Sequence, residues 1–239
     1  MWLTHPKRRS PSLREEWLSD PAKRKEEGLE RLLRRFGVHV SDAQERKLGL
    51  YIDELEAWNQ KINLTGVSSR QRIIAELLVD SLLSVPFLPE EGTLLDVGAG
   101  AGFPAIPIKI CRPGLRCQLL EPNSKRISFL KQVIRVARLQ DIGVLAGRIE
   151  DHETVFPPDG YDIITSRAFV ALPRLLSLCA PYLSPYGRMV AFLGSDSESI
   201  VRQSEGILDA HRMRPVRRIP YTLPGKSTKR EIIILEKES

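Results

Sequence analysis

The sequence predicts an α/β fold: a mostly parallel sheet of seven strands that ends in an antiparallel C-terminal hairpin and follows a helical N-terminal part. Three observations lead to this expectation. The first third of the chain shows only helical periodicity. After Gly92, short apolar runs alternate with helical stretches, which is typical of βαβ units. Between the last two strand candidates lies a loop rich in proline, glycine and lysine, with no helix in it.

The N-terminal third begins with a tail. Residues 1–22 are polar and basic, so we expect them to be flexible, and they lack the apolar stretch of a secretory signal. Residues 23–90 should form a helical subdomain. Its first helix ends at Gly37 and presents apolar residues at steps of three and four: Leu29, Leu32, Leu33 and Phe36.

Two further helices complete this subdomain. Ser41 is a candidate N-cap for a helix over residues 41–60. A third helix should span residues 70–85 and end before Pro86. The turn NLTG, which starts at Asn63, separates the two.

Residues 91–239 should form the sheet and the helices that cover it. We expect strands near residues 93–97, 117–120, 142–145, 161–165, 188–193, 213–221 and 231–236. We expect helices near residues 105–111, 125–139, 172–183 and 198–212. A chain of 239 residues suits such a domain with a helical appendage.

Charge and cysteine content narrow the possible partners. The net charge of +6 favours an anionic partner without choosing its kind. Residues 212–230, in the C-terminal hairpin, include seven cations and no acidic residue. The cations are Arg212, Arg214, Arg217, Arg218, Lys226, Lys229 and Arg230. No apolar run reaches the ~18 residues of a membrane span. Three cysteines and four histidines show no metal-ligand spacing, so we expect no metal and buried, reduced thiols.

The stretch LLDVGAGAGFPAIP predicts a ligand site. Gly98, Gly100 and Gly102 follow a strand that ends in Asp96 and Val97. Glycines permit positive φ angles and let the backbone approach a ligand closely. A strand, a glycine turn and a helix in this order are typical of nucleotide sites.

The spacing argues against a dinucleotide. Dinucleotide sites use G-x-G-x-x-G, whereas this chain has G-x-G-x-G with Phe103 at the third glycine position. The carboxylate of Asp96 would repel a pyrophosphate and would suit a cation such as the sulfonium of S-adenosylmethionine. Glu121, at the end of the next strand, can accept from the two ribose hydroxyls. Two alternatives remain. The site could bind another nucleotide, or the glycines could serve packing alone, with Glu121 as an ordinary carboxylate at the end of a strand.

Six motifs in order resemble one family: NLTG, LVDSLL, LLDVGAGAGFPAIPI, LLEPNSKRISFLKQV, GRIED and ITSRAF. They resemble the RsmG (GidB) family, bacterial methyltransferases that modify N7 of a guanosine in the 530 loop of 16S ribosomal RNA. The resemblance covers residues 48–194 and, more weakly, the C-terminal hairpin. It implies a class I methyltransferase (Rossmann-like) domain over residues 91–239. It also implies S-adenosylmethionine as cofactor and 16S rRNA or the small ribosomal subunit as partner. We expect a cytoplasmic monomer.

The resemblance also assigns residues. Gly98 and Phe103 match cofactor-contacting positions of the turn, and Ile149 and Glu150 match the adenine-side pair. Arg167, in SRAF, matches a cofactor-site arginine that we also expect to be catalytic. Asn63 and Asp80 match the helical-domain signature at the active-site rim, and we expect Asn63 to take part in catalysis.

Two positions depart from the family pattern. Leu78 stands where the family usually has a histidine, and Leu193 where it usually has a lysine. We expect both positions to lie near RNA or substrate. The cofactor site is untouched by them, so a relative that binds RNA but catalyses weakly is an alternative, as is a methyltransferase with another acceptor.

The chemistry needs no base. N7 of guanine has a lone pair and no proton, so positioning and exclusion of water suffice for in-line methyl transfer. Arg167 could hold the methionine carboxylate, an RNA phosphate or guanine O6, and a salt bridge to Asp96 or Asp162 is the alternative. Phe103 and Phe169 could stack on a base or pack in the core. We expect His152 at the surface. The hairpin cations suit phosphate contacts, or form a solvated positive surface.

Overall fold

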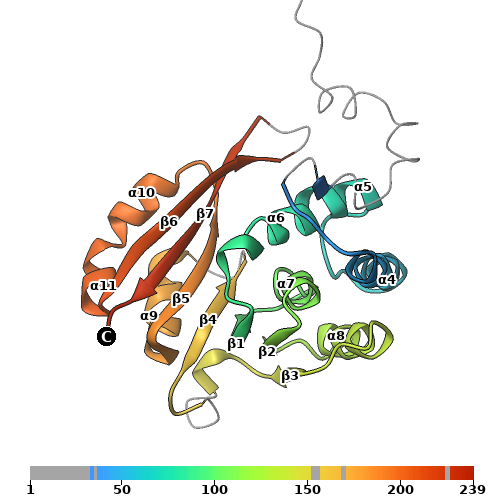
Figure 1. The fold of residues 1–239 in the computed structure, drawn as a ribbon, viewed down its shortest axis with the longest axis horizontal. Coiled ribbons are helices and arrows are strands. Elements are labelled where there is room, and N and C mark those ends of the chain that lie inside the picture. The colour runs from blue at the N-terminus through green and yellow to red at the C-terminus, as the bar shows by residue number, and fades with distance from the viewer. Residues whose placement is uncertain (1–32, 35–36, 152–156, 168–170, 224–226) are drawn as a thin grey trace, which may run out of the picture.

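A single seven-stranded sheet organises the molecule (Figure 1). This computed structural model describes residues 33–34, 37–151, 157–167, 171–223 and 227–239. The sheet has the order β3-β2-β1-β4-β5-β7-β6. Its strands are β1 (Glu91–Val97), β2 (Gly114–Glu121), β3 (Ile142–Ala146), β4 (Tyr161–Ser166), β5 (Leu183–Leu193), β6 (Met213–Thr222) and β7 (Lys229–Lys237). Among these strands β7 alone has the reversed direction and is antiparallel to both β5 and β6, which confirms the predicted fold class.

The central strands are apolar on both faces because each face is covered. Leu94 of β1 points into one core and Leu95 into the other, as alternate residues of a strand must. The first core includes residues of α4 (Asp42–Asn59), α7 (Ala105–Cys111) and α8 (Ser124–Val136). The second includes residues of α9 (Leu172–Cys179) and α11 (Glu205–Ala210). Figure 1 shows these two helix groups on opposite sides of the sheet.

The N-terminal helices share the first core with the sheet. Ser41 caps α4 as predicted: its hydroxyl accepts from the Gln44 amide, and the Gln44 side chain accepts from the Ser41 amide. Tyr51 and Leu55 of α4 are fully buried in the same core as Ile106 of α7. The helical part is therefore built directly onto the sheet.

The expected third helix has an irregular centre. It consists of α5 (Arg70–Ile73), a π-helical turn η1 (Ile74–Leu78) and α6 (Val79–Leu82). It ends at Leu82, not at Val85, and a short 3₁₀ turn η2 (Val85–Phe87) follows. The last residues separate from the helix because Pro86 has no amide hydrogen and restricts Val85.

Other boundaries differ modestly from the expectation. The helix predicted over residues 172–183 ends at Cys179, since the 3₁₀ turn η4 (Ala180–Tyr182) contains Pro181, and β5 therefore starts at Leu183. The helix predicted over residues 198–212 is divided into α10 (Ser197–Gln203) and α11 at Ser204, whose hydroxyl donates to the Ile200 carbonyl. A short 3₁₀ turn η3 (Ile149–Asp151) follows β3.

Some predictions fall partly or wholly outside the described residues. Leu33 is helical and buried, and Gly37 has φ +72°, which agrees with a helix end there. The tail, residues 1–22, and the residues Leu29, Leu32 and Phe36 lie outside the described part of the chain.

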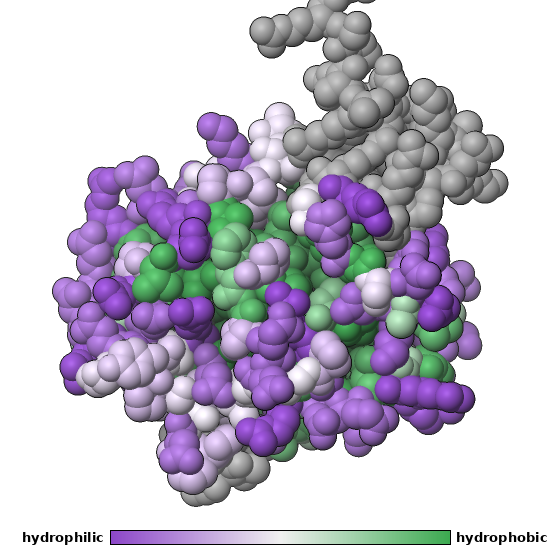
Figure 2. Space-filling view, viewed as in Figure 1, coloured by the Kyte–Doolittle hydropathy of each residue, from purple (hydrophilic) through white to green (hydrophobic). Residues whose placement is uncertain are grey.

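The described residues include no helix that is both long and apolar enough to cross a membrane. Cys111, Cys117 and Cys179 are buried and unpaired, as predicted. Burial raises the pKa of each thiol to about 12, so all three are protonated at neutral pH. Polar residues gather along the rim of the face shown in Figure 2, and apolar residues show nearer its centre.

Candidate functional site

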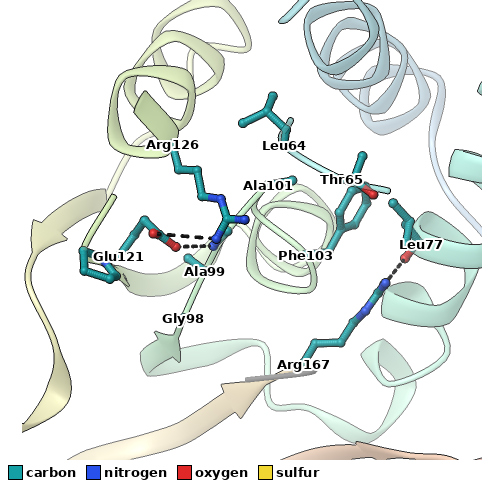
Figure 3. A pocket seen from close by; sticks show the side chains of 12 residues that line it. Leu64, Thr65, Leu77, Gly98, Ala99, Ala101, Phe103, Glu121, Arg126 and Arg167 are labelled. Carbon is teal, nitrogen blue, oxygen red and sulfur yellow. Dashed lines mark hydrogen bonds and ion pairs between the residues drawn. The ribbon is translucent and has the colours of Figure 1, made fainter. Parts of the chain in front are cut away.

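A concave site lies where the chain order of the sheet reverses, between β1 and β4. Open α/β sheets bind ligands at the carboxyl ends of the strands at such a point. A cavity of about 400 Å³ lies there. Six segments line it: the turn after β1, the end of β2, the start of α8, the loop after β4, the α4–α5 connection and the turn η1 (Figure 3). The predicted cofactor residues Gly98, Gly100, Phe103, Glu121 and Arg167 are all among its lining.

The amides of the glycine turn are already hydrogen bonded. Gly98 and Ala99 both donate to the Leu120 carbonyl at 3.0 Å, and Gly100 donates to the Glu121 carboxylate at 2.8 Å. Gly102 donates to the Ala99 carbonyl at 2.7 Å. These four amides are therefore not free to bind a phosphate, which is the usual role of amides in such a turn.

Two glycines have distinct structural reasons. Gly100 has φ +57°, which turns its amide toward Glu121. Gly102 has φ +89°, and a Cβ there would lie 2.5 Å from Cδ1 of Ile106. Gly102 therefore lets the turn pack on α7 and does not line the cavity.

Glu121 is a buried carboxylate held in place from two sides. It is 2% exposed; its Oε2 accepts from Gly100 and its Oε1 from the Asn123 amide at 2.9 Å. The Arg126 guanidinium lies 4.0 Å from Oε1 (Figure 3). Each carboxylate oxygen can accept more than one hydrogen bond, so acceptor capacity remains for ligand hydroxyls.

Asp96 differs from the expectation, because it is buried and does not line the cavity. The Thr165 hydroxyl donates to its Oδ1 at 2.7 Å, whereas Oδ2 has no hydrogen-bond partner in the described part of the chain. Burial raises the pKa of Asp96 to about 7, against the lowering effects of Thr165, the Ala105 amide and Arg167. Asp96 can act on a bound cation only through the field that it creates, not by direct contact.

Arg167 lies on the side of the cavity away from Glu121 (Figure 3). Its Nη1 lies 3.4 Å from Oδ2 of Asp80 and 3.5 Å from the Leu77 carbonyl. The alternative partners Asp96 and Asp162 were wrong: Asp80 holds Arg167, and Asp162 accepts from the Thr93 amide at 2.8 Å.

Phe103 serves the core and the cavity together. The Arg167 guanidinium carbon lies 5.8 Å from the centre of its ring, and the Tyr51 ring centre lies 5.1 Å away. Phe103 is 7% exposed, so it contributes one edge to the cavity and packs with the rest. The predicted alternatives of stacking and packing are thus compatible here.

A second cavity of about 320 Å³ adjoins the first and shares Gly98 and Pro122 with it. The predicted adenine-side residues Ile149 and Glu150 line this cavity, and Arg174 lies 3.4 Å from Glu150. The two cavities together form an elongated site that runs from Glu150 to Arg167, with Glu121 between.

The remaining predicted residues lie elsewhere. Asn63 is exposed, and its neighbours Leu64 and Thr65 line the cavity while Asn63 does not. Leu78 is fully buried in the first core, and Leu193 packs against the second. Neither leucine lines the two cavities, contrary to the expected place near substrate. The residues His152 and Phe169 lie outside the described part of the chain.

Sequence reasoning missed three contributors to the site. Arg126 lies in the motif LLEPNSKRISFLKQV, three residues after the helix cap Asn123, and its place shortly after Glu121 is the only signal for it. Thr65 belongs to the NLTG turn. Tyr51 donates from α4 to the Ala101 carbonyl at 2.6 Å and so fixes the glycine turn. No local sequence pattern indicates this contact, because it joins residues that are 50 positions apart.

The hairpin cations are more fully paired than the sequence indicated. Arg214 lies 3.5 Å from Glu236, Arg218 lies 2.8 Å from Glu231, and Arg230 lies 3.5 Å from Asp80. Arg217 instead lies over the Phe87 ring, 5.2 Å from its centre. Arg212 and Lys229 are exposed, and Lys226 lies outside the described residues. The acidic partners come from β7 and α6, which a run of residues 212–230 cannot reveal.

A sheet of this strand order, with its ligand cavity above β1 and β4 and β7 as the reversed strand, is the fold of class I methyltransferases. A methyltransferase from Pyrococcus furiosus matches it with a TM-score of 0.56 at 12% identity, over 80% of this chain and 98% of that one. M. jannaschii TYW2 in complex with AdoMet gives 0.55 at 14%, over 73% and 79%. At these identities the likeness concerns the fold.

The chain belongs to the GidB family, rRNA small subunit methyltransferase G, whose model matches residues 44–221. Ribosomal RNA small subunit methyltransferase G of Geobacter sp. (strain M21) is 35% identical over 200 residues, which cover 84% of this chain and 92% of that protein. The protein of the same name from Acetivibrio thermocellus is 37% identical over 206 residues, 84% of each chain. Family membership confirms the predicted methyltransferase and its cofactor, S-adenosylmethionine.

Proposed function

We propose that the chain transfers the methyl group of S-adenosylmethionine to N7 of a guanosine in the 530-loop region of 16S ribosomal RNA. One observation carries the proposal. The glycine turn lies in space between Glu121 and Arg167, and its amides at Gly98, Ala99 and Gly100 are not free to bind a phosphate. The name of the relatives supports the small-subunit RNA as substrate. The guanine atom and the loop come from the family that the six motifs resemble.

The elongated site suits a donor with an adenine, a ribose and an amino-acid end. Ile149 and Glu150 would hold the adenine, with Glu150 accepting from its amino group. Glu121 would accept from the ribose hydroxyls, for which its buried and fixed carboxylate has acceptor capacity. The amino-acid end would then lie along Gly98, Ala99 and the first cavity. Asp96, buried behind the turn, would favour the positive charge of the donor through its field.

The reaction asks little of the side chains beyond placement. The bound donor supplies a methyl carbon on a positively charged sulfur. The lone pair of N7 would form the new bond to that carbon as the carbon–sulfur bond breaks. The electron pair of the broken bond would stay on sulfur. No proton moves at N7. This agrees with the site, where Glu121 is occupied by two amides and neither cavity is lined by histidine, cysteine or lysine in the described residues.

Arg167 and Phe103 would place the acceptor. They face each other at the end of the cavity remote from Glu121. Arg167 can donate to guanine O6 or to an RNA phosphate. A pose in which it donates to both O6 and N7 is excluded, because it would occupy the reacting lone pair. Asn63, exposed beside Leu64 and Thr65, would contact the RNA at the rim.

The substrate class can be tested directly. Purified protein is incubated with labelled S-adenosylmethionine and 30S subunits, naked 16S RNA or naked 23S RNA from cells that lack the corresponding enzyme. The proposal predicts label in 16S RNA, presented naked or in subunits, and background label in 23S RNA. Label confined to protein or to 23S RNA would favour another acceptor. An absence of label despite measurable donor binding would indicate a relative that binds RNA without catalysis.

A further inference from the structure

Asp80 is a buried carboxylate at the meeting point of three segments that are distant in sequence. It lies in α6, is 1% exposed, and faces Arg167 from the loop after β4 and Arg230 from the start of β7. The Tyr221 hydroxyl, 141 residues away on β6, donates to its Oδ1. Burial raises the pKa of Asp80, while Arg167, Tyr221 and Arg230 oppose this rise. Asp80 is thus the shared partner of two arginines.

The two carboxylate oxygens of Asp80 have different partners. Oδ2 lies 3.4 Å from Nη1 of Arg167, and Oδ1 lies 3.5 Å from Nη1 of Arg230 and also accepts from Tyr221. The side chain of Arg167 is 18% exposed, so one end of it is fixed in the protein while it still lines the cavity. No other carboxylate pairs with Arg167 within the described part of the chain.

The π-helical turn supplies a second acceptor for the same arginine. Leu77, in η1, presents its carbonyl to Nη1 of Arg167 at 3.5 Å (Figure 3). The same carbonyl accepts from the Ser81 hydroxyl at 2.7 Å. π-helical turns are frequent at functional sites, since they redirect backbone groups that a regular helix would satisfy internally. Leu77 and Asp80 therefore form a two-point clamp on one guanidinium.

We infer that Asp80 is a positioning residue that sets the orientation of Arg167 toward the acceptor base. The inference rests on the proposed function, in which Arg167 places the guanine. A planar guanidinium held by two acceptors at one nitrogen, Nη1, keeps the N–H groups of its other nitrogens directed into the cavity. Without the Asp80 charge, Arg167 gains rotamers that point elsewhere, and near-attack placement of the base becomes rarer.

The test is a double-mutant cycle on methyl transfer to 16S RNA. Asp80→Asn keeps the size of the side chain and removes its charge. We expect kcat to fall by about tenfold or more, because small misplacements at a reacting centre are costly. The KM for S-adenosylmethionine should change by less than about threefold, since Glu121 and Glu150 are untouched. In the Arg167→Gln background, Asp80→Asn should change kcat by less than about twofold, because its effect passes through Arg167.

The matched control is Glu231→Gln, a buried carboxylate of β7 next to Arg230, the hairpin residue that contacts Asp80. Glu231 is 8% exposed and accepts two hydrogen bonds from Arg218 at 3.0 and 2.8 Å, but it does not contact Asp80 or Arg167. Loss of the Glu231 charge should leave kcat within about twofold of wild type, although it also breaks an ion pair whose carboxylate is buried. An equal fall in both variants would mean that hairpin integrity alone matters.

Two results would overturn the role of Asp80: a kcat within twofold of wild type in Asp80→Asn, or an equal fall in the wild-type and Arg167→Gln backgrounds.

If Asp80→Asn does not fold, Tyr221→Phe replaces it, which removes one hydrogen bond from Asp80 and no charge. It should lower kcat only when Arg167 is present, and an equal fall in both backgrounds would again contradict the inference. Label at an atom other than guanine N7 with the wild-type protein would instead contradict the proposed function. The comparison of kcat between the wild-type and Arg167→Gln backgrounds would still test the role of Asp80.

Discussion

Glu121 joins the glycine turn, the end of β2 and the proposed ribose position in one side chain. Its two oxygens accept from Gly100 and Asn123, so the carboxylate has little freedom to rotate. This fixed orientation distinguishes it from a solvated strand-end carboxylate. The sequence could predict the residue from its place after the second strand, but not the two amides that orient it.

Glu121→Gln should weaken binding of S-adenosylhomocysteine, which shares the ribose with the donor. An amide has one acceptor oxygen where the carboxylate has two, and it presents an NH₂ group where an acceptor is needed. Loss of hydrogen bonds to a charged group corresponds to about 1.5–3 kcal/mol, or roughly 10- to 150-fold in Kd. Isothermal titration calorimetry measures this, with Glu90→Gln, an exposed carboxylate, as the control. An affinity within twofold of wild type would refute the assigned role.

Asp96 makes the stability of the protein depend on pH. Burial raises its pKa from 3.8 to about 7 in the folded state. Between these values the folded chain binds more protons than the unfolded chain, so the contribution of Asp96 is present at low pH and is lost as pH rises through about 7. The loss is at most about 1.4 kcal/mol per pH unit.

Urea denaturation of wild type and Asp96→Asn tests this linkage. The difference in unfolding free energy, wild type minus variant, should fall from about pH 5 to about pH 7 and level off above. Since the variant cannot titrate at this position, other groups cancel in the difference. Parallel pH profiles for the two proteins would contradict the raised pKa of Asp96.

At the scale of elements, the turn between β1 and α7 is shaped by packing as much as by its ligand. Gly98 and Gly100 line the cavity, whereas Gly102 faces Ile106 and Leu130. The G-x-G-x-G pattern therefore combines two glycines that line the cavity with one that serves packing. The sequence alone could not separate these roles.

Gly102→Ala should destabilise the protein. The residue has φ +89°, and the new Cβ would lie 2.5 Å from Ile106. Strain and overpacking of this kind cost about 1–3 kcal/mol each. The control is Gly49→Ala in α4, where a Cβ meets nothing within 4 Å, so a gain of about 0.5–1 kcal/mol is expected. Thermal unfolding midpoints measure both, and a Gly102→Ala midpoint equal to wild type would contradict the packing argument.

The positions of the strands and most helices along the chain could be predicted from the sequence, because βαβ alternation and apolar periodicity are local signals. The order of the strands within the sheet was not predicted, since it depends on pairing between distant segments. The helix Ala105–Cys111 has the predicted bounds. The π-helical turn could not be predicted, since Ile74–Leu78 has the composition of a regular helix. The pairing of Arg218 with Glu231 depends on the hairpin register, which shifts between Pro215 and Arg217. Asp80 matched a family signature, but its partners come from the loop after β4, from β6 and from β7.

At the scale of the whole molecule, the net charge of +6 is unevenly available to a partner. Arg214, Arg218 and Arg230 are paired with carboxylates, whereas Arg212 is exposed and Arg217 lies over Phe87. If the hairpin binds RNA, Arg212 and Arg217 should contribute most to its affinity, because they have no carboxylate partner to lose in the described part of the chain.

Arg212→Gln and Arg217→Gln should each weaken RNA binding and lower its dependence on salt. Each lost phosphate contact reduces the slope of log K against log salt by about 0.7 for single-stranded RNA. Filter binding of a 16S fragment at several salt concentrations gives the slope. Arg202→Gln on α10 is the control of equal charge, since Arg202 is exposed and paired with Glu198. Equal slopes for all three variants would place the RNA elsewhere.

The central claim is that this fold methylates N7 of a guanosine in small-subunit RNA. The most direct test digests 16S RNA to nucleosides after incubation with the protein and S-adenosylmethionine, and separates the products by mass spectrometry. The proposal predicts 7-methylguanosine at about one per RNA molecule or less, absent without protein and strongly reduced with Arg167→Gln. Methylation at another atom, or unmodified RNA from a protein that binds the donor, would contradict it.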